Sequence, residues 1–371
     1  KIKIGANFRQ YTPDSKGSIF MDTASSIVNN EFGVYTGAEI NFLGEVLKLN
    51  TTLRADKNEN FDVNLSPAAS IVYKPNKDDV FRLSFGSALR NPTLSDQYLY
   101  YNVGRAILIG NLNGHGVKYG ENLVTIESLY EYFTPSFPVY DSLKFFSVDP
   151  IKPEKAKSIE LGYRSTISNK LYVDANVYYS EYTDFIGYKI GAKFLADTTN
   201  GGYSITLPSI QAYRMAANAE NKVTTKGASI GINYYPNSDV SINGNYSWNS
   251  LNEKGTNDPI IPAYNTPEHK FNLGCLIKNI HFSKQKSFLR DFSCSVNYKW
   301  VQGFQYEGSP QFTGYVPTYD IVDLQISKEI IRLNATVKLG STNLLNNLHY
   351  EVYGGPYIGR MSYCSILFNI N

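Results

Sequence analysis

Apolar and polar residues alternate along most of this chain with a period of two. From Leu171 to Tyr179 the odd positions are apolar or aromatic, while Asp, Asn and Tyr occupy the even positions. From Val240 to Trp248 one face carries Val, Ile, Gly, Tyr and Trp, and the other carries only Ser and Asn. This alternation predicts strands with one apolar face and one polar face. No segment shows the 3.6-residue period of an amphipathic helix.

The alternation predicts about fourteen strands. Their expected positions are near 1–10, 33–43, 46–55, 62–73, 80–88, 157–166, 170–190, 210–236, 239–250, 268–279, 290–302, 319–330, 333–344 and 361–370.

The connections between these strands alternate between short turns and long loops. Short turns fall at 43–45, 74–79, 168–170, 236–239 and 330–332, with a somewhat longer one near 280–289. Between them lie loops at 11–32, 89–156, 191–209, 251–267, 303–318 and 345–360, and a brief one at 56–61. A soluble sandwich gives no reason for every long loop to lie at one end, whereas outer-membrane barrels have this succession. We therefore predict an all-β fold, an antiparallel transmembrane β-barrel in the bacterial outer membrane.

The composition agrees with the wall of a transmembrane β-barrel and excludes several other classes of protein. The 371 residues include 30 Tyr against 20 Phe and 2 Trp, and 18% are charged, with a net charge of +2. No run approaches the roughly 18 apolar residues of a transmembrane helix, and no basic tract suggests nucleic acid. Cys275, Cys294 and Cys364 lie on apolar registers, where a thiol behaves as a small hydrophobe. The four His are scattered and no nucleophile–base pair is evident, so we expect no enzyme, metal site or cofactor.

Four stretches are similar to the C-terminal half of TonB-dependent outer-membrane receptors, especially the Bacteroidota type that includes SusC-like transporters. They are Phe81–Leu94 with its Arg-Asn-Pro-Thr turn, Ile151–Tyr163, Asn265–Phe271, and Asn343–Glu351 together with Gly354–Arg360; Tyr11–Gly17 is a weaker fifth. They occur in the family's order and span nearly the whole chain. Unlike many such barrels, the chain does not end on an aromatic residue but on Phe368-Asn-Ile-Asn371.

The resemblance implies that residues 1–371 are the C-terminal part of a barrel of 22 strands, the number found in outer-membrane transporters. The chain would supply strands nine to twenty-two. We expect the remaining strands, the N-terminal plug domain and the TonB-contacting segment to lie upstream, in a longer precursor. The implied partners are outer-membrane lipid, the TonB-ExbB-ExbD complex through that upstream region, and a SusD-like surface lipoprotein or other outer-membrane subunits.

The segment 89–156 is the candidate binding region, because loops this long inside a compact fold are usually functional. It is expected to be extracellular, and its aromatic side chains with Asn and Gly between them suit glycans or peptides as well as plain loop packing. The candidate contact residues for substrate or partner are Arg90, Tyr98, Tyr100, Tyr101, Tyr119, Tyr130 and Tyr132. Charged residues on the polar faces are expected to pair with one another or with a plug; they are Lys48, Arg54, Arg82, Glu160, Asp174 and Asp323.

Three functions are compatible with this pattern. The first is TonB-dependent import of a bulky nutrient such as a siderophore, glycan, peptide or vitamin. The second is a receptor-like barrel that serves as a structural subunit of a larger outer-membrane complex. The third is a passive, closed channel of fourteen strands, which an even strand count permits.

Overall fold

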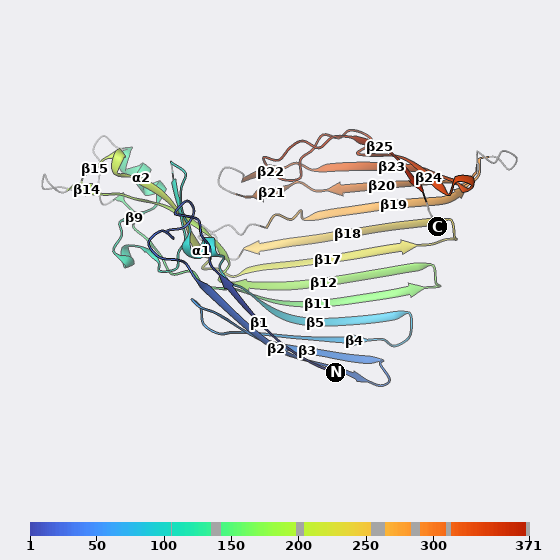
Figure 1. Ribbon diagram of the computed structural model, residues 1–371, viewed down its shortest axis with the longest axis horizontal. Helices are drawn as coiled ribbons and strands as arrows, with labels where there is room; N and C mark the ends of the chain where they lie inside the picture. Colours follow the sequence, from blue (N-terminus) through green and yellow to red (C-terminus); the bar gives the residue numbers. More distant parts are fainter. Residues whose placement is uncertain are drawn as a thin grey trace.

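The computed structural model describes residues 1–104, 106–134, 142–197, 204–253, 264–282, 290–308 and 313–368. Fourteen antiparallel strands form one continuous curved sheet in sequence order (Figure 1). These strands are β1 (Ile2–Tyr11), β2 (Asn29–Phe42), β3 (Leu47–Asn58), β4 (Asn64–Tyr73), β5 (Asp79–Arg90), β11 (Glu154–Ile167), β12 (Leu171–Thr183), β17 (Val223–Tyr234), β18 (Val240–Glu253), β19 (His269–Ile280), β20 (Phe292–Val301), β23 (Tyr319–Ile330), β24 (Ala335–Thr342) and β25 (Met361–Phe368). The predicted all-β wall and its number of strands are confirmed.

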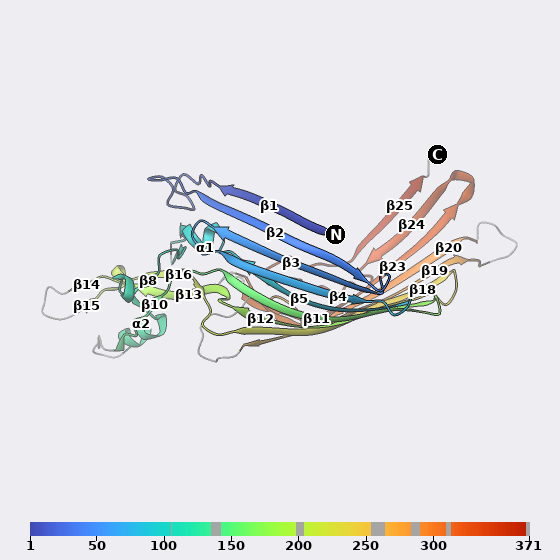
Figure 2. The ribbon, with the colours of Figure 1, turned by 90° about the horizontal axis from the view of Figure 1, so that it is seen from below.

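The sheet is open within the described residues. Its order runs from β1 to β25, and these two strands are its edges instead of pairing with each other. Figure 2 shows a trough whose two edge strands stand apart on the same side. The alternative of a closed fourteen-stranded channel therefore does not form in this structure. Among the described residues, no helix is both long and apolar enough to cross a membrane.

The apolar face of the sheet is exposed. Leu161, Val177 and Leu273 are 54%, 51% and 54% exposed, and they belong to three different strands. Buried apolar clusters occur elsewhere, in the long connections near one end of the sheet. A soluble sheet would cover such a face, because large contiguous apolar surfaces are rare on soluble monomers. The exposed apolar face is what a lipid-facing wall requires.

On the opposite, polar face, glycines let long side chains reach across a strand. Arg54 on β3 passes over Gly33 of β2 and donates to Asn7 Oδ1 on β1 at 2.9 Å. Arg82 on β5 passes over Gly162 of β11 and pairs with Asp174 on β12 at 2.6 Å.

Two tyrosines repeat this arrangement. Tyr178 crosses Gly227 to Asn249 at 2.8 Å, and Tyr363 crosses Gly340 to Gln325 at 2.9 Å. A Cβ on any of the four glycines would clash with the side chain above it. Side chains two strands apart meet most easily on a concave face, so the polar face is the inner one.

The charged residues expected on the inner face all have polar partners nearby, and the partners of Glu160 and Asp323 are uncharged. Lys48 pairs with Glu39 at 2.9 Å, and Arg54 pairs with Asp56 at 2.5 Å. Glu160 accepts from Asn176 at 3.0 Å, and Asp323 accepts from the backbone N–H of Asn343 at 2.9 Å. The inner wall is thus a polar surface whose charges are largely satisfied within the wall.

The short turns contain residues suited to tight reversals. Ser168 and Asn169 have φ of +52° and +54°, and Lys170 N–H donates to the Ile167 carbonyl, as in a hairpin turn with two left-handed residues. At two other turns, Asn76 and Asn237 each follow a proline and accept two backbone N–H groups at 2.8–2.9 Å. Asn stabilises such turns because its side chain mimics a backbone acceptor.

Two long connections are more structured than expected. The predicted strand at 170–190 is two strands, β12 and β13 (Ile186–Lys193), and that at 210–236 is also two, β16 (Gln211–Asn218) and β17. The predicted loop 191–209 is correspondingly longer, 184–222. Asp184, with φ of +55°, interrupts the first segment. The 303–318 loop contains the hairpin β21 (Phe304–Glu307) with β22 (Thr313–Val316), and the sequence shows no signal for it.

Replacing Val177 by Arg should destabilise the assembled barrel by about 2–4 kcal/mol, because the charge would face hydrocarbon at mid-strand. The matched control is Ser84→Arg, on the polar face beside Glu160 at nearly the same level of the wall. The measurement is the free energy of unfolding of each full-length variant in detergent or lipid. Equal stability of the two variants would contradict the assignment of the faces.

Candidate functional site at the long-loop end of the wall

The described residues of the loops 91–153 and 184–222 fold together into a compact unit, which we call the loop module. Figures 1 and 2 show it beyond one end of β5, β11 and β12. Its five-stranded sheet has the order β6-β7-β16-β13-β9, with the pair β7/β16 parallel. The first loop contributes β6 (Tyr100–Asn102), β7 (Ala106–Ile109), β8 (His115–Gly116), β9 (Leu123–Val124), β10 (Ser147–Val148), α1 (Leu94–Tyr98), α2 (Ile126–Phe133) and the 3-10 turn Val117–Tyr119; the second contributes β13, β14 (Ala196–Asp197), β15 (Ser204–Ile205), the turn Leu207–Ser209 and β16.

Asn111 joins the two loops. It is fully buried, and its amide nitrogen donates to the carbonyls of Asp149 at 2.7 Å and Ala216 at 2.8 Å. Its side-chain oxygen accepts from Gly114 N–H at 2.9 Å. One side chain thus satisfies three backbone groups from both loops, two of them through buried hydrogen bonds, which stabilises the pairing of the loops.

A second polar junction connects the module to the wall. Glu154, 7% exposed at the start of β11, accepts from Arg90 Nη1 at 3.3 Å and from Ile186 N–H at 3.1 Å. Nearby, buried Gln97 accepts from Asn29 at 3.1 Å and from Asn60 at 2.7 Å. These contacts hold the base of both loops against the ends of the wall strands.

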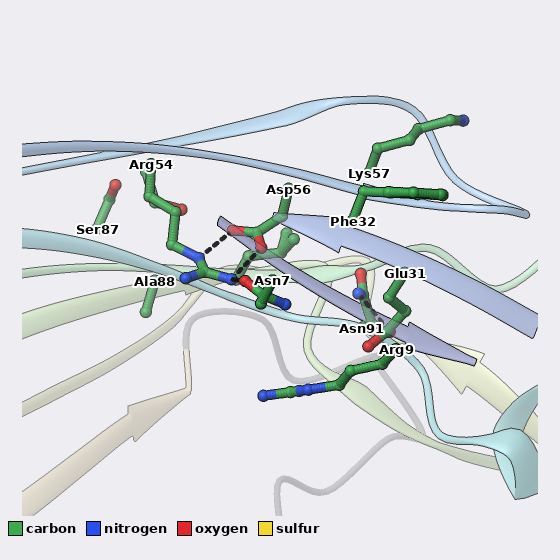
Figure 3. A pocket seen from close by; sticks show the side chains of 12 residues that line it. Asn7, Arg9, Glu31, Phe32, Arg54, Asp56, Lys57, Ser87, Ala88 and Asn91 are labelled. Atoms are coloured by element: carbon green, nitrogen blue, oxygen red, sulfur yellow. Dashed lines mark hydrogen bonds and ion pairs between the residues drawn. The ribbon is translucent and has the colours of Figure 1, made fainter. Parts of the chain in front are cut away.

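A hollow of about 440 Å³ lies on the wall below this junction (Figure 3). Arg54 lies in it, held by Asp56 and Asn7, and Arg9 is exposed nearby. Asn91 donates to Glu31 Oε1 at 3.0 Å on its other side. Arg, Asn and carboxylate groups together offer donors and acceptors for a polar solute rather than a catalytic arrangement.

Above the wall, the module carries a stacked cation. The Arg214 guanidinium carbon lies 3.4 Å from the centre of the Tyr188 ring. Burial lowers the pKa of Arg214 and raises the pKa of Tyr188, although the guanidinium remains charged at any physiological pH. Within the described part of the chain Arg214 forms no ion pair. The buried Asp96 attracts Arg214 without forming an ion pair with it and accepts from the Tyr188 hydroxyl at 3.5 Å, so the guanidinium keeps donors that an anionic ligand could use.

The predicted contact residues divide into two groups. Four are accessible: Arg90, whose side chain is 52% exposed, Tyr100, Tyr101 and Tyr130. Three have structural contacts: Tyr98 accepts from Asn60 at 2.6 Å, Tyr119 donates to Asp149 at 2.9 Å, and Tyr132 is 3% exposed. Tyr132 packs in a buried cluster with Leu129 and Phe194, so in this structure it is not available to a ligand.

Tyr188 and Arg214 were not among the residues predicted from the sequence, because they fell inside segments taken as long strands. Segment length was the available signal. Runs of 21 and 27 residues exceed the roughly 9–11 that a tilted strand needs to span a bilayer. In the part of the chain that the structure describes, no three His, Cys, Asp or Glu residues are grouped to hold a metal ion.

The arrangement defines a class: a transmembrane β-wall with a polar inner face and a folded loop module at one end. The family described as TonB dependent receptor-like, beta-barrel, matches residues 2–344, so the chain belongs to this family. It is therefore a part of an outer-membrane barrel.

Solved structures share this fold at low sequence identity. The FrpB iron transporter from Neisseria meningitidis is 13% identical at a TM-score of 0.62, with 98% of this chain and 52% of that chain covered. The siderophore receptor PirA from Acinetobacter baumannii is also 13% identical, at a TM-score of 0.62, with 98% and 51% covered. The copper transporter OprC is 13% identical at 0.61, with 98% and 53% covered. The chain thus spans about half the length of these structures. No curated protein sequence matches it.

Replacing Asn111 by Ala should destabilise the loop module locally by at least about 2 kcal/mol, because several buried backbone groups lose their partner. Hydrogen exchange of β7 and β16 in the full-length protein measures this loss. Asn113→Ala, at an exposed position two residues away, should have little effect. Equal protection in the two variants would exclude Asn111 as the junction.

The module should also loosen in acid through Glu121. Burial raises the pKa of its carboxyl, but hydrogen bonds from Lys193 at 2.5 Å and Gly116 N–H at 2.8 Å, with the charge of Lys193 and His115, produce a net lowering. The stabilisation of the module by the Glu121 carboxylate is complete above the pKa of Glu in the unfolded chain, about 4.3. It is lost as the pH falls from there through the lower folded pKa.

The readout is hydrogen exchange of residues 115–124, corrected for intrinsic rates, at pH 7 and below pH 4. Glu121→Gln should show weaker protection at pH 7 and little further loss in acid. A variant that loses as much protection on acidification as the wild type would refute the assignment.

Proposed function

We propose that this chain forms the wall and extracellular module of a TonB-dependent receptor that imports a bulky solute across the outer membrane. The observation that carries the proposal is the polar inner wall beneath a separately folded module, in a chain of this family. Further strands would pair with the open edges of β1 and β25 to close a barrel near 22 strands. An upstream plug and TonB-contacting segment would couple the barrel to the TonB-ExbB-ExbD complex.

The printed descriptions of the similar structures, an iron transporter, a siderophore receptor and a copper transporter, favour a metal or a metal chelate as cargo. Arg214 on Tyr188 supports an anionic chelate over a free cation, because a guanidinium that forms no direct ion pair can donate to an anion and offers no ligand to a cation. A glycan, peptide or vitamin fits the Arg214 guanidinium less directly as cargo than an anionic chelate does. We include in the proposal that the receptor is of the SusC-like type, in which a surface lipoprotein caps the mouth of the barrel. Co-purification of such a lipoprotein from native membranes would test this part.

The test is uptake by cells that carry the full-length protein, a deletion of its gene, or a deletion of TonB. Radiolabelled ferric siderophores and copper are offered separately. At least one cargo should accumulate only when both the receptor and TonB are present. Accumulation that persists without TonB, or no receptor-dependent accumulation with any cargo in the panel, would refute the proposal.

Arg214→Ala should weaken binding of the transported anionic cargo about 10–100-fold, because a hydrogen bond to a charged group contributes about 1.5–3 kcal/mol. Lys144→Ala is the control, since Lys144 is exposed elsewhere on the same module. Cargo affinity of the purified full-length receptor is the measurement. If both variants bind as the wild type does, the cargo does not contact the Arg214 stack.

A further inference from the structure

The outer face of the wall carries lysines just above its apolar band. Lys155 and Lys157 share their face of β11 with Ile159 and Leu161, the alternate residues that face lipid. Lys226 lies on the same face of β17, directly opposite Tyr179 of β12. Lys222 precedes β17 at the same end. We call these four residues the lysine row.

The strand register places the lysine row at the edge of the membrane. Below it, the outward residues of β12 run from Tyr179 down to Leu171, eight residues or roughly 26 Å at about 3.3 Å each. Tilted as barrel strands are, that length approaches the hydrocarbon band of about 25 Å. Tyr179 and Trp248 lie at this upper boundary, where amphipathic rings favour the interface. The lysines therefore lie at the level of the headgroups on the loop side, which is the outer leaflet.

Three of the four lysines form no ion pair within the described residues, although Glu181 lies directly opposite Lys157 across the pair of β11 and β12. Lys222 pairs with Glu181 at 2.8 Å, which raises the pKa of the lysine. Lys226 lies 5.7 Å from the centre of the Trp248 ring. Across the described ranges, Lys155, Lys157 and Lys226 form no ion pair. The nearby acid Glu268 accepts from the Trp248 indole at 3.2 Å.

A hollow of about 530 Å³ adjoins the row and provides space for a headgroup. Its charged lining residues are Lys118, Lys152, Lys155, Asp62, Asp149 and Asp184. Lys118 and Asp149 are paired at 2.7 Å. Lys152 and Lys155 are left facing this space without an ion pair in the described chain. Phe61 and Pro150 add apolar lining.

We propose that the lysine row binds the phosphate groups of outer-leaflet lipid headgroups, which fixes the depth and rotation of this wall in the membrane. Phosphate is the chemistry that several closely spaced ammonium groups recognise. Lipid is the source because the row lies directly above the hydrocarbon-facing residues, where a lipid presents phosphate and acyl chain together. The site is separate from the inner face and from the Arg214 stack, so it does not depend on the transported cargo.

The experiment measures lipid retained by the full-length receptor in detergent, by native mass spectrometry. The probes are lipopolysaccharide, the same lipid with its phosphates removed, and inorganic phosphate as a competitor. The test variant is Lys155→Gln with Lys157→Gln and Lys226→Gln. The control variant is Lys74→Gln with Lys77→Gln and Lys170→Gln, which removes equal charge at the short-turn end of the barrel.

The wild type and the control variant should retain lipopolysaccharide, and the test variant should retain it about 100-fold more weakly, at roughly 1 kcal/mol per lysine. Heat-dependent gel mobility shows whether each variant is a folded barrel; unfolding is not expected, since the three side chains are exposed. Should the test variant fail to fold, the three single substitutions, each expected to weaken retention about fivefold, decide the question in its place.

Three results would overturn the proposal. The first is equal retention by the test and control variants. The second is equal retention of the dephosphorylated lipid by the wild type, which would assign the binding to acyl chains. The third is displacement of the lipid by millimolar inorganic phosphate, which would make the row a free-anion site instead of a lipid site.

Discussion

Backbone hydrogen bonding in hydrocarbon constrains every other feature of this protein. Lipid offers no partner to an exposed N–H or C=O, so strands that cross it must pair on both sides. The fourteen-stranded ladder from β1 to β25 meets this need at every internal strand. Because side chains alternate along a strand, the same ladder forces apolar residues outward and polar residues inward.

The inner face shows how a polar wall can remain ordered without a packed core. Glycines under Arg54, Arg82, Tyr178 and Tyr363 let these side chains lie flat and bond to the strand beyond. Each such contact joins three strands, so the inner surface is stiffened by polar contacts where a soluble sheet would use buried Leu and Ile. A wall of this kind keeps its shape while its interior stays open to water.

The two ends of the strands have different roles, because the connections at one end are mostly short and those at the other are mostly long. At one end most connections are turns of three to five residues that only reverse the chain, and Asn supplies local acceptors in two of them. At the other, two loops far apart in sequence bury their own apolar clusters and share Asn111. Packing of that kind makes the module a small domain held at its base by Glu154 and Gln97, which gives it a defined surface toward the mouth and toward the lipid headgroups.

The two-residue rhythm of the sequence by itself determined the wall: the fourteen strands, their order, the side that each face takes and the end that bears the long loops. It could do so because strand pairing between neighbours and the choice of face depend on local alternation. Only the tertiary structure decided that the sheet is open, that β7 pairs in parallel with β16, and that Tyr132 is buried while Tyr188 meets Arg214. Those outcomes arise from contacts between separate segments, about 100 residues apart for β7 and β16, on which period and turn residues carry no information.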